Sequence, residues 1–253
     1  MNFSPDIPNT ARRSERGNVF FMILIAVVLI GLLTAAIMST STTEGSNIDD
    51  ETLVIRASEV QRAASEYERA VLFILSNGKS EEDIRFAHAS ADPDYGDLSA
   101  DTDPADQVFS PRGGGAAYRD APDDINNGSA WEFYGGTAIP GVGTNKADLI
   151  AVLPNVTQQF CDRINELNGQ PVTPIPEDTG TGAAAGASPG DCLNIGALGR
   201  FDDAQQFYGT PNTVDETTFA QDSNTSAARP ALQACVRCSL GPAMHFYHVL
   251  LAR

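Results

Sequence analysis

"ARRSERGNVFFMILIAVVLIGLLTAAIMSTSTTEG", residues 11–45, is the stretch that decides the fold. No side chain between Asn18 and Met38 is charged. A helix over Val19–Met38, at about 1.5 Å of rise per residue, is about 30 Å long and matches the roughly 30 Å hydrocarbon layer of a bilayer. The apolar region of a cleaved signal peptide is usually only about 7–15 residues long, so this run is too long for one. The sequence therefore predicts a transmembrane helix over residues 18–39.

The charges on either side of this run predict its orientation. Basic residues precede it and acidic residues follow it: Arg12, Arg13 and Arg16 on one side, and Glu44, Asp49, Asp50 and Glu51 on the other. Because Lys and Arg are retained on the cytoplasmic side of a membrane, we expect residues 1–17 in the cytoplasm. Everything after Met38 is then exported.

The composition limits the partners of the exported part. The chain has 253 residues, with 33 acidic and 16 basic side chains and a formal net charge of −17. This balance argues against nucleic acid, whose phosphates would repel the protein, and against docking on an anionic membrane surface. After the anchor and its stalk, roughly 170 residues remain, which is enough for one domain.

Residues 40–78 continue the predicted helix with an amphipathic pattern. Apolar residues recur at alternating steps of four and three, which places them on one helix face: Leu53, Ala57, Val60, Ala64, Tyr67, Val71 and Ile74. Asn77 and Gly78 are a plausible end, because both tolerate the left-handed conformation found after helices.

Residues 79–253 change to a pattern of short apolar runs bounded by Gly, Pro, Asn or Asp, which predicts strands. The runs are "QVFS" (107–110), "AAYR" (116–119), "AWEFYG" (130–135), "KADLIAVLP" (146–154) and "AMHFYHVLLAR" (243–253). "SEED" (80–83) fits the start of a short helix through Phe86, and residues 157–169 predict a longer amphipathic one. The expected fold class is α+β: a long N-terminal helix, membrane-spanning in its first half, packed on a C-terminal antiparallel sheet.

All four cysteines, Cys161, Cys192, Cys235 and Cys238, follow the apolar run. An even number in an exported domain indicates two disulfides, and four cysteines allow three pairings. We favour Cys161–Cys192 with Cys235–Cys238, because the first bond would close the loop around "TPIPEDTGTGAAAGASPGD" and restrict the unfolded chain.

Two groups of residues could bind a metal ion, but each also has a purely structural interpretation. The loop with Asp92, Asp94, Asp97, Asp101 and Asp103 could supply oxygen ligands to calcium, but it lacks the EF-hand register, and a solvated loop is favoured. Cys235, Cys238, His245 and His248 could bind zinc. In a strand, however, residues 245 and 248 point to opposite faces, so a structural disulfide is favoured there.

Little in the sequence indicates catalysis. His88, His245 and His248 lie in no recognisable nucleophile or metal signature. "PRGGGAAY" (111–118) lacks the Lys-Ser/Thr of a phosphate-binding loop and predicts a hairpin turn. "CVRC" (235–238) has the spacing of a redox dithiol, but a turn follows it, whereas a thioredoxin-type site opens a helix. We therefore expect no enzyme and no cofactor.

The segment "SERGNVFFMILIAVVLIGLLTAAIM" (14–38) combines a short basic leader, a glycine and an uninterrupted apolar helix. Over residues 12–76 the chain resembles type IV pilins and the pseudopilins of type II secretion. The resemblance implies cleavage by a prepilin peptidase between Gly17 and Asn18, and a pilin-like fold. It also implies contacts with other pilin-like subunits through the apolar helix, where Ala26, Gly31 and Ala35 allow close approach.

The chain departs from that pattern at two positions. Met22 stands where the family has a Glu that neutralises the neighbouring subunit's N-terminal amine, and Asn18 replaces the usual Phe. Some minor pseudopilins lack that Glu, so the resemblance implies a minor pilin or pseudopilin in the bacterial inner membrane, with its C-terminal domain periplasmic or extracellular. The alternative is a permanently anchored single-pass periplasmic binding protein. A third hypothesis, a membrane-tethered enzyme or thiol oxidoreductase, requires a deep pocket or a reducible Cys235–Cys238 pair.

Overall fold

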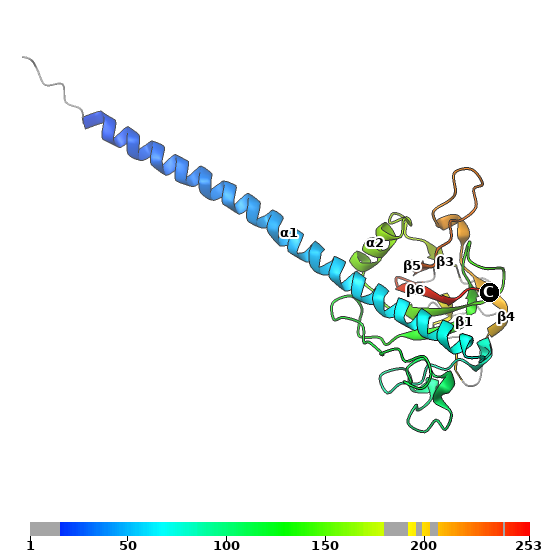
Figure 1. Cartoon of the computed structure of the whole chain (residues 1–253). Helices are drawn as coiled ribbons and strands as arrows, with labels where there is room; N and C mark the ends of the chain where they lie inside the picture. The colour runs from blue at the N-terminus through cyan, green and yellow to red at the C-terminus, as the bar shows by residue number, and fades with distance from the viewer. Residues whose placement is uncertain (1–15, 180–191, 196–198, 203–206, 240) are drawn as a thin grey trace, which may run out of the picture. The chain divides into compact units, whose positions relative to one another are not determined.

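The computed structural model describes residues 16–179, 192–195, 199–202, 207–239 and 241–253, and within the first helix it describes the side chains of residues 21–30 and of those from Asp50 onward. The chain divides into two compact units, Met1–Glu51 and Thr52–Arg253. Helix α1, Arg16–Ser76, contributes residues to both units (Figure 1).

In the first unit, the described side chains of α1 are exposed. They include nine large apolar residues: Phe21, Met22, Ile23, Leu24, Ile25, Val27, Val28, Leu29 and Ile30, with exposed fractions from 39% at Ile25 to 65% at Ile30. Within the described residues, no helix has the length and apolar character that a membrane crossing requires. The helix itself is present, but the prediction that its first half spans a membrane is wrong for the described residues.

In the second unit, one face of α1 forms part of the main hydrophobic core. Its central residue is Tyr67, which is fully buried and makes edge contacts with Phe109 and Trp131, with ring centroids 5.2 and 5.5 Å away. The apolar residues that share the predicted helix face are buried or half-buried: Leu53, Ala57, Val60, Ala64, Tyr67, Val71 and Ile74. The 3.6-residue period thus locates the buried face correctly.

The sheet of the second unit has six strands in the order β3-β5-β6-β2-β1-β4. Their bounds are Glu132–Ala138 (β1), Asp148–Leu153 (β2), Glu177–Asp178 (β3), Phe207–Thr213 (β4), Gln233–Cys238 (β5) and Met244–Leu251 (β6). The four central strands pair antiparallel, but β4 pairs parallel to β1 and β3 pairs parallel to β5.

The predicted fold class is therefore wrong for the sheet, which is mixed. A parallel pair needs a long crossover between its strands. β1 and β4 are far apart in sequence, with β2, α2 and β3 between them, and β3 and β5 are also separated by a long connection that contains β4. Both edges of the sheet are thus built from residues that are distant in sequence, which the local pattern of apolar runs does not reveal.

Both faces of the sheet are buried. Phe133, Ala151, Cys235 and Phe246 face the core that contains α1 and α2, while their chain neighbours Tyr134, Ile150, Val236 and Tyr247 face a second core. The second core is closed by irregular chain that includes Leu193, Val214 and Phe219. A sheet buried on both faces explains the continuous apolar run of β2, "DLIAVL".

Helix α2, Gln158–Leu167, follows the sequence pattern closely. Thr157 caps it, because its hydroxyl accepts a hydrogen bond from the Phe160 amide, and Gly169 after it has a positive φ of 66°. The short helix predicted through Phe86 is only a 3₁₀ turn, Glu81–Asp83, after the capping residue Ser80. The predicted strands at 107–110 and 116–119 are not formed, and "PRGGGAAY" is a turn without flanking strands.

Candidate functional site

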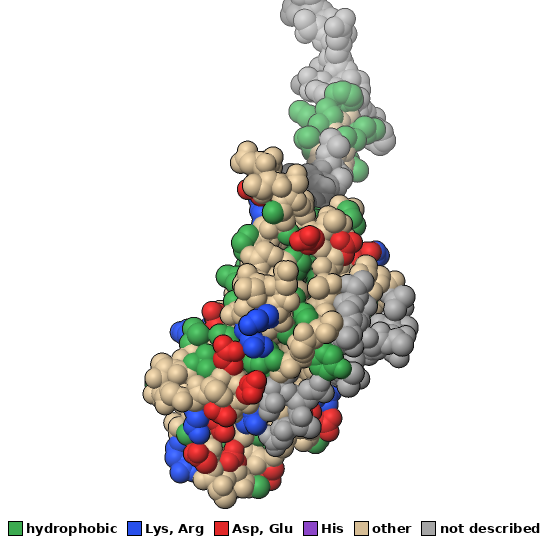
Figure 2. Space-filling model, turned by 90° about the vertical axis from the view of Figure 1, so that its right-hand side faces the viewer, with side chains coloured by type: hydrophobic (Ala, Val, Ile, Leu, Met, Phe, Trp, Pro, Cys, Tyr) green, Lys and Arg blue, Asp and Glu red, His purple; other side chains and the backbone are tan. Residues whose placement is uncertain are grey.

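The exposed apolar side chains of residues 21–30 form the first candidate functional surface. At 3.6 residues per turn, ten consecutive helical residues cover every side of the helix. All ten are exposed, so within the described part of the first unit no side of this stretch is covered. Figure 2 shows apolar side chains of this stretch on one face. Large exposed apolar patches on proteins mark sites of contact with other proteins or with membranes.

The predicted processing site lies at the beginning of the same helix. Gly17 and Asn18 are residues of the first turn of α1, and the leader before Arg16 lies outside the described residues. Cleavage between Gly17 and Asn18 stays a prediction.

The four cysteines are all paired, as Cys161–Cys235 and Cys192–Cys238, with Cα atoms 5.2 and 5.4 Å apart. The favoured pairing of Cys161 with Cys192 and of Cys235 with Cys238 is therefore wrong. Cys235 and Cys238 both belong to β5, where a separation of three residues spans about 10 Å and turns the side chains to opposite faces. That distance is beyond the reach of one disulfide, so "CVRC" is not a redox dithiol.

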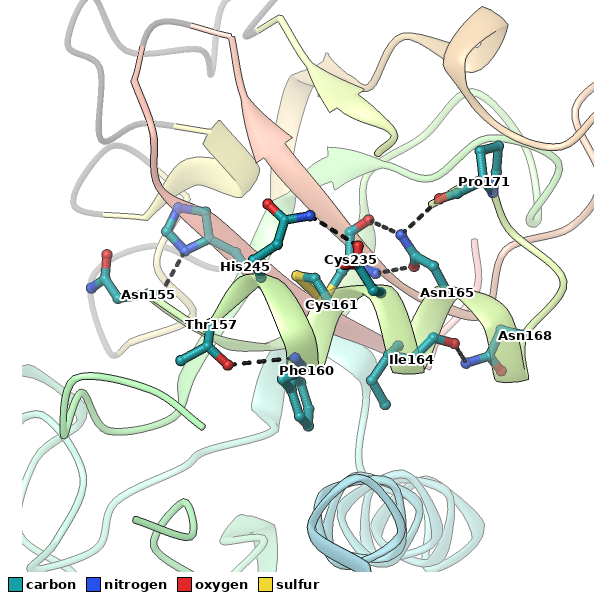
Figure 3. Close-up of a disulfide and its surroundings, with 12 residues drawn as sticks. Asn155, Thr157, Phe160, Cys161, Ile164, Asn165, Asn168, Pro171, Cys235 and His245 are labelled. Carbon is teal, nitrogen blue, oxygen red and sulfur yellow. Dashed lines mark hydrogen bonds between the residues drawn. A yellow bond between two sulfur atoms is a disulfide. The ribbon is translucent and has the colours of Figure 1, made fainter. Parts of the chain in front are cut away.

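The Cys161–Cys235 disulfide joins α2 to β5, and a buried amide supports it (Figure 3). The side chain of Asn165 accepts a hydrogen bond from the Cys235 amide at 2.8 Å and donates one to the Cys235 carbonyl at 3.1 Å. It donates another to the Pro171 carbonyl at 3.2 Å. Asn165 therefore satisfies backbone groups of β5 under the helix, a structural role for which the sequence carries no signal.

The second disulfide has a buried histidine beside it. Nδ1 of His245 accepts a hydrogen bond from the Asn155 amide at 3.1 Å, so the neutral ring carries its proton on Nε2. Nε2 lies 3.1 Å from Sγ of Cys238 and can donate to it. Burial lowers the pKa of His245 to about 4, which keeps the ring neutral.

This arrangement does not fit the zinc site that the sequence left as the less favoured alternative. Cys192, Cys238 and His245 are the one group in the described chain whose ligand atoms are spaced for a metal, all within 4.8 Å. Both sulfurs, however, are bonded to each other, and the His245 nitrogen that faces them carries the proton. His248 points to the other face of the sheet and donates from Nε2 to Glu68 of α1 at 2.8 Å.

The acidic loop does not converge on a cation either. Arg200 pairs with Asp92, Asp94 and Glu132 and lies over the Tyr95 ring. Each of the remaining aspartates has a separate partner: Asp97 accepts from Ser99, Asp101 accepts from Gln107 and Asp103 pairs with Lys79. The five candidate calcium ligands thus bind protein groups, and their carboxylates do not surround a common position for a cation.

Comparison of the chain with protein-family models, curated proteins and solved structures finds no match. The assignment of function therefore depends on the surfaces just described.

His88 is the third histidine of the chain. It stacks on Tyr118, with ring centroids 4.5 Å apart, and its Nδ1 accepts a hydrogen bond from the Ser90 amide at 3.1 Å. These contacts give His88 a structural role in holding the chain before the acidic loop.

Proposed function

We propose that this chain is a minor pilin or pseudopilin-like structural subunit of a bacterial envelope filament or secretion system. The observation that carries the proposal is the exposed apolar stretch of residues 21–30. In water, leaving such side chains uncovered costs about 1.5–3 kcal/mol each relative to burial. The stretch needs a partner, and other subunits of the same kind, together with the inner membrane before assembly, would provide it.

The second unit supports a structural role. α1 supplies buried residues from Ala57 to Ile74 to its core. The helix that carries the apolar stretch is therefore also an integral element of the head, which is the second unit, Thr52–Arg253. A subunit needs such a link between the part that assembles and the part that is presented.

The disulfides support the proposed location of the head. Two are present, and disulfides form and persist in oxidising compartments such as the bacterial periplasm. The two disulfides thus support a location of the head outside the cytoplasm.

Processing is the first test. The full chain would be expressed in a bacterium that carries a prepilin peptidase, and its intact mass measured without reductant. We expect a mature terminus at Asn18 in the wild type, retention of residues 1–17 in Gly17→Leu, and normal processing in the control Ser14→Ala. A wild type that keeps residues 1–17 would overturn the proposal and favour the permanently anchored binding protein.

Assembly is the second test. A photo-crosslinking amino acid would be placed at exposed Val28, with exposed Asp123 as the control position. We expect covalent adducts to other pilin-like subunits from position 28 and none from position 123. If position 28 gives only lipid adducts, the chain is held at the membrane without a filament.

A further inference from the structure

A pocket of about 350 Å³ lies in the second unit between α1 and the segment before β1. Its apolar residues are Val60 and Ala63 of α1, Trp131, and the half-buried Ala121 and Pro122. Small-molecule sites have volumes of about 300–1,000 Å³, a mostly apolar lining and a few polar groups. This pocket is at the small end of that range.

The wall of the pocket is held by hydrogen bonds. The indole Nε1 of Trp131 donates to the Arg119 carbonyl at 3.0 Å, and the Arg119 amide donates to the Tyr67 hydroxyl at 3.0 Å. The rings of Tyr67 and Trp131 are in edge contact. The backbone of Arg119 is therefore fixed against the same two aromatic residues that fill the core, and the pocket is formed before any ligand arrives.

Three arginines, Arg56, Arg62 and Arg119, line this pocket in a chain of net charge −17. Arg56 pairs with Glu59 at 3.1 Å and Arg119 pairs with Glu66 at 3.4 Å. Arg62 is exposed, and among the described residues no ion pair involves it. Nε of Arg56 is buried without an acceptor in the described chain, and an unsatisfied buried donor costs about 1–3 kcal/mol.

The unpaired guanidinium indicates the class of ligand. Glu59 and Asp120 also line the pocket, and Glu66 pairs with Arg119. Three arginines thus face three carboxylates, and Arg62 is the guanidinium for which the described residues offer no ion pair. A guanidinium matches the two oxygens of a carboxylate in a bidentate pair. The apolar lining can accept a short hydrocarbon body.

We propose that this pocket binds a small organic monoanion with a carboxylate head and a short apolar body. The carboxylate lies against Arg56 and Arg62, and the body lies against Val60, Ala63 and Trp131. This binding activity goes beyond the structural role proposed above, and it does not depend on processing at Gly17 or on assembly.

Trp131 provides the test, because it is the one tryptophan of the chain. The full chain, in a nonionic detergent at fixed ionic strength and pH 7, would be titrated with hexanoate while tryptophan emission is recorded. We expect a saturable change with hexanoate, a weaker response to the dianion succinate, and none with hexan-1-ol, which has the same body without the charge. No saturable change with hexanoate, or an equal response to hexan-1-ol, overturns the proposal.

Matched variants test the arginines. Arg62→Ala and Arg56→Ala are expected to weaken hexanoate binding at least tenfold. Arg69→Ala removes an exposed arginine of the same helix that does not line the pocket, and it is expected to leave binding unchanged. Equal weakening by Arg69→Ala would overturn the proposal, because it would indicate a general charge effect. Thermal unfolding of each variant checks that the head is folded.

A last pair of probes distinguishes the source of the carboxylate. N-acetyl-leucine imitates a polypeptide C-terminus, and N-acetyl-leucinamide is its uncharged counterpart. Tighter binding of N-acetyl-leucine than of hexanoate supports a protein C-terminus as the natural ligand, and the reverse supports a free small acid. Binding of the amide as tightly as the acid would contradict recognition of a carboxylate.

Discussion

At the scale of single residues, His245 makes the stability of the head depend on pH. Burial lowers its pKa to about 4, from 6.5 in the unfolded chain. Between these values the unfolded state binds more protons, so the stabilisation from neutral His245 is present above about pH 6.5 and lost as the pH falls through 4. At about 1.4 kcal/mol per pKa unit, we expect a loss of about 2–3 kcal/mol between pH 7 and pH 4.5.

Urea unfolding of wild type and His245→Gln at pH 7 and pH 4.5 measures this loss. The variant is expected to be less stable at pH 7, because it loses the contacts with Asn155 and Cys238. It should also lose less stability than the wild type on acidification. Equal losses in both proteins would contradict a neutral buried His245.

Asp148 has the opposite effect on the pH dependence of stability, in a pH range that overlaps with that of His245. Burial raises its pKa to about 6, although it accepts hydrogen bonds from the amides of Ile139 and Arg253. Because the folded state binds more protons than the unfolded state between pH 3.8 and pH 6, this contribution is present below pH 3.8 and is lost as the pH rises through 6.

The variant Asp148→Asn isolates that contribution. It cannot ionise, so between pH 4.5 and pH 7 the free energy of unfolding of the wild type should fall relative to that of the variant. The comparison cancels the effect of His245, which both proteins share. A constant difference between the two proteins across this range would show that Asp148 does not titrate there.

At the scale of elements, the disulfide between α2 and β5 is expected to contribute more to stability than any single hydrogen bond around it. Cys161 and Cys235 are separated by 74 residues in sequence, and closing a loop of that length restricts the unfolded chain by up to about 4 kcal/mol. The double variant Cys161→Ala/Cys235→Ala should unfold at lower urea concentration, with a loss of about 2–4 kcal/mol.

The same variant checks the pairing. Proteolysis without reductant followed by mass spectrometry should show Cys192 linked to Cys238 in both proteins and Cys161 linked to Cys235 in the wild type alone. A peptide that links Cys161 to Cys192 would contradict the structure.

The sequence predicts the elements that carry a strong local pattern. The sequence predicts β1, β2, β6 and α2 near their observed bounds, because their apolar residues are continuous or periodic and their ends carry Gly, Pro or Thr157. β4, "FYGTPNT", was missed, since Pro and Gly disfavour strands and are tolerated at an edge. The "QVFS" segment shows the opposite error, because a strand is predicted there and none forms. Its residues Val108 and Phe109 are buried, but they belong to an irregular segment.

The sites were harder to predict because their partners are distant in sequence. Asn165 meets Cys235, and His248 meets Glu68, 180 residues away. The partners of each pair are too far apart in sequence for a local pattern to indicate that they meet. The opposite directions of His245 and His248 were predicted correctly, because strand geometry alone decides them.

At the scale of the whole molecule, charge is distributed without a dominant patch on the face that Figure 2 shows. Asp and Glu side chains alternate there with Lys and Arg side chains over the second unit. The net charge of −17 thus reflects the excess of acidic over basic side chains in the whole chain, and no single acidic patch on this face accounts for it. This pattern favours solubility of the head. The pocket beside Trp131 differs from it, because three arginines line one pocket in an acidic chain.

The division of the chain at Glu51 and Thr52 leads to the last prediction. A fragment of residues 52–253 retains every α1 residue of the main core, from Ala57 to Ile74, and both disulfides. We expect it to be soluble and to unfold cooperatively. A fragment of residues 79–253 lacks Tyr67 and the rest of that helix face, which removes one wall of the core, and deletion of a single large core side chain already costs about 3–5 kcal/mol.

Near-ultraviolet circular dichroism and thermal unfolding distinguish the two fragments. The longer one should show a tertiary signal and one sharp transition, and the shorter one neither. Pairing of the cysteines gives an independent readout, since only a folded head should form Cys161–Cys235 and Cys192–Cys238 in high yield. Cooperative unfolding of residues 79–253 would mean that α1 covers the core without being required for it, and the link between the apolar stretch and the head would lose its structural basis.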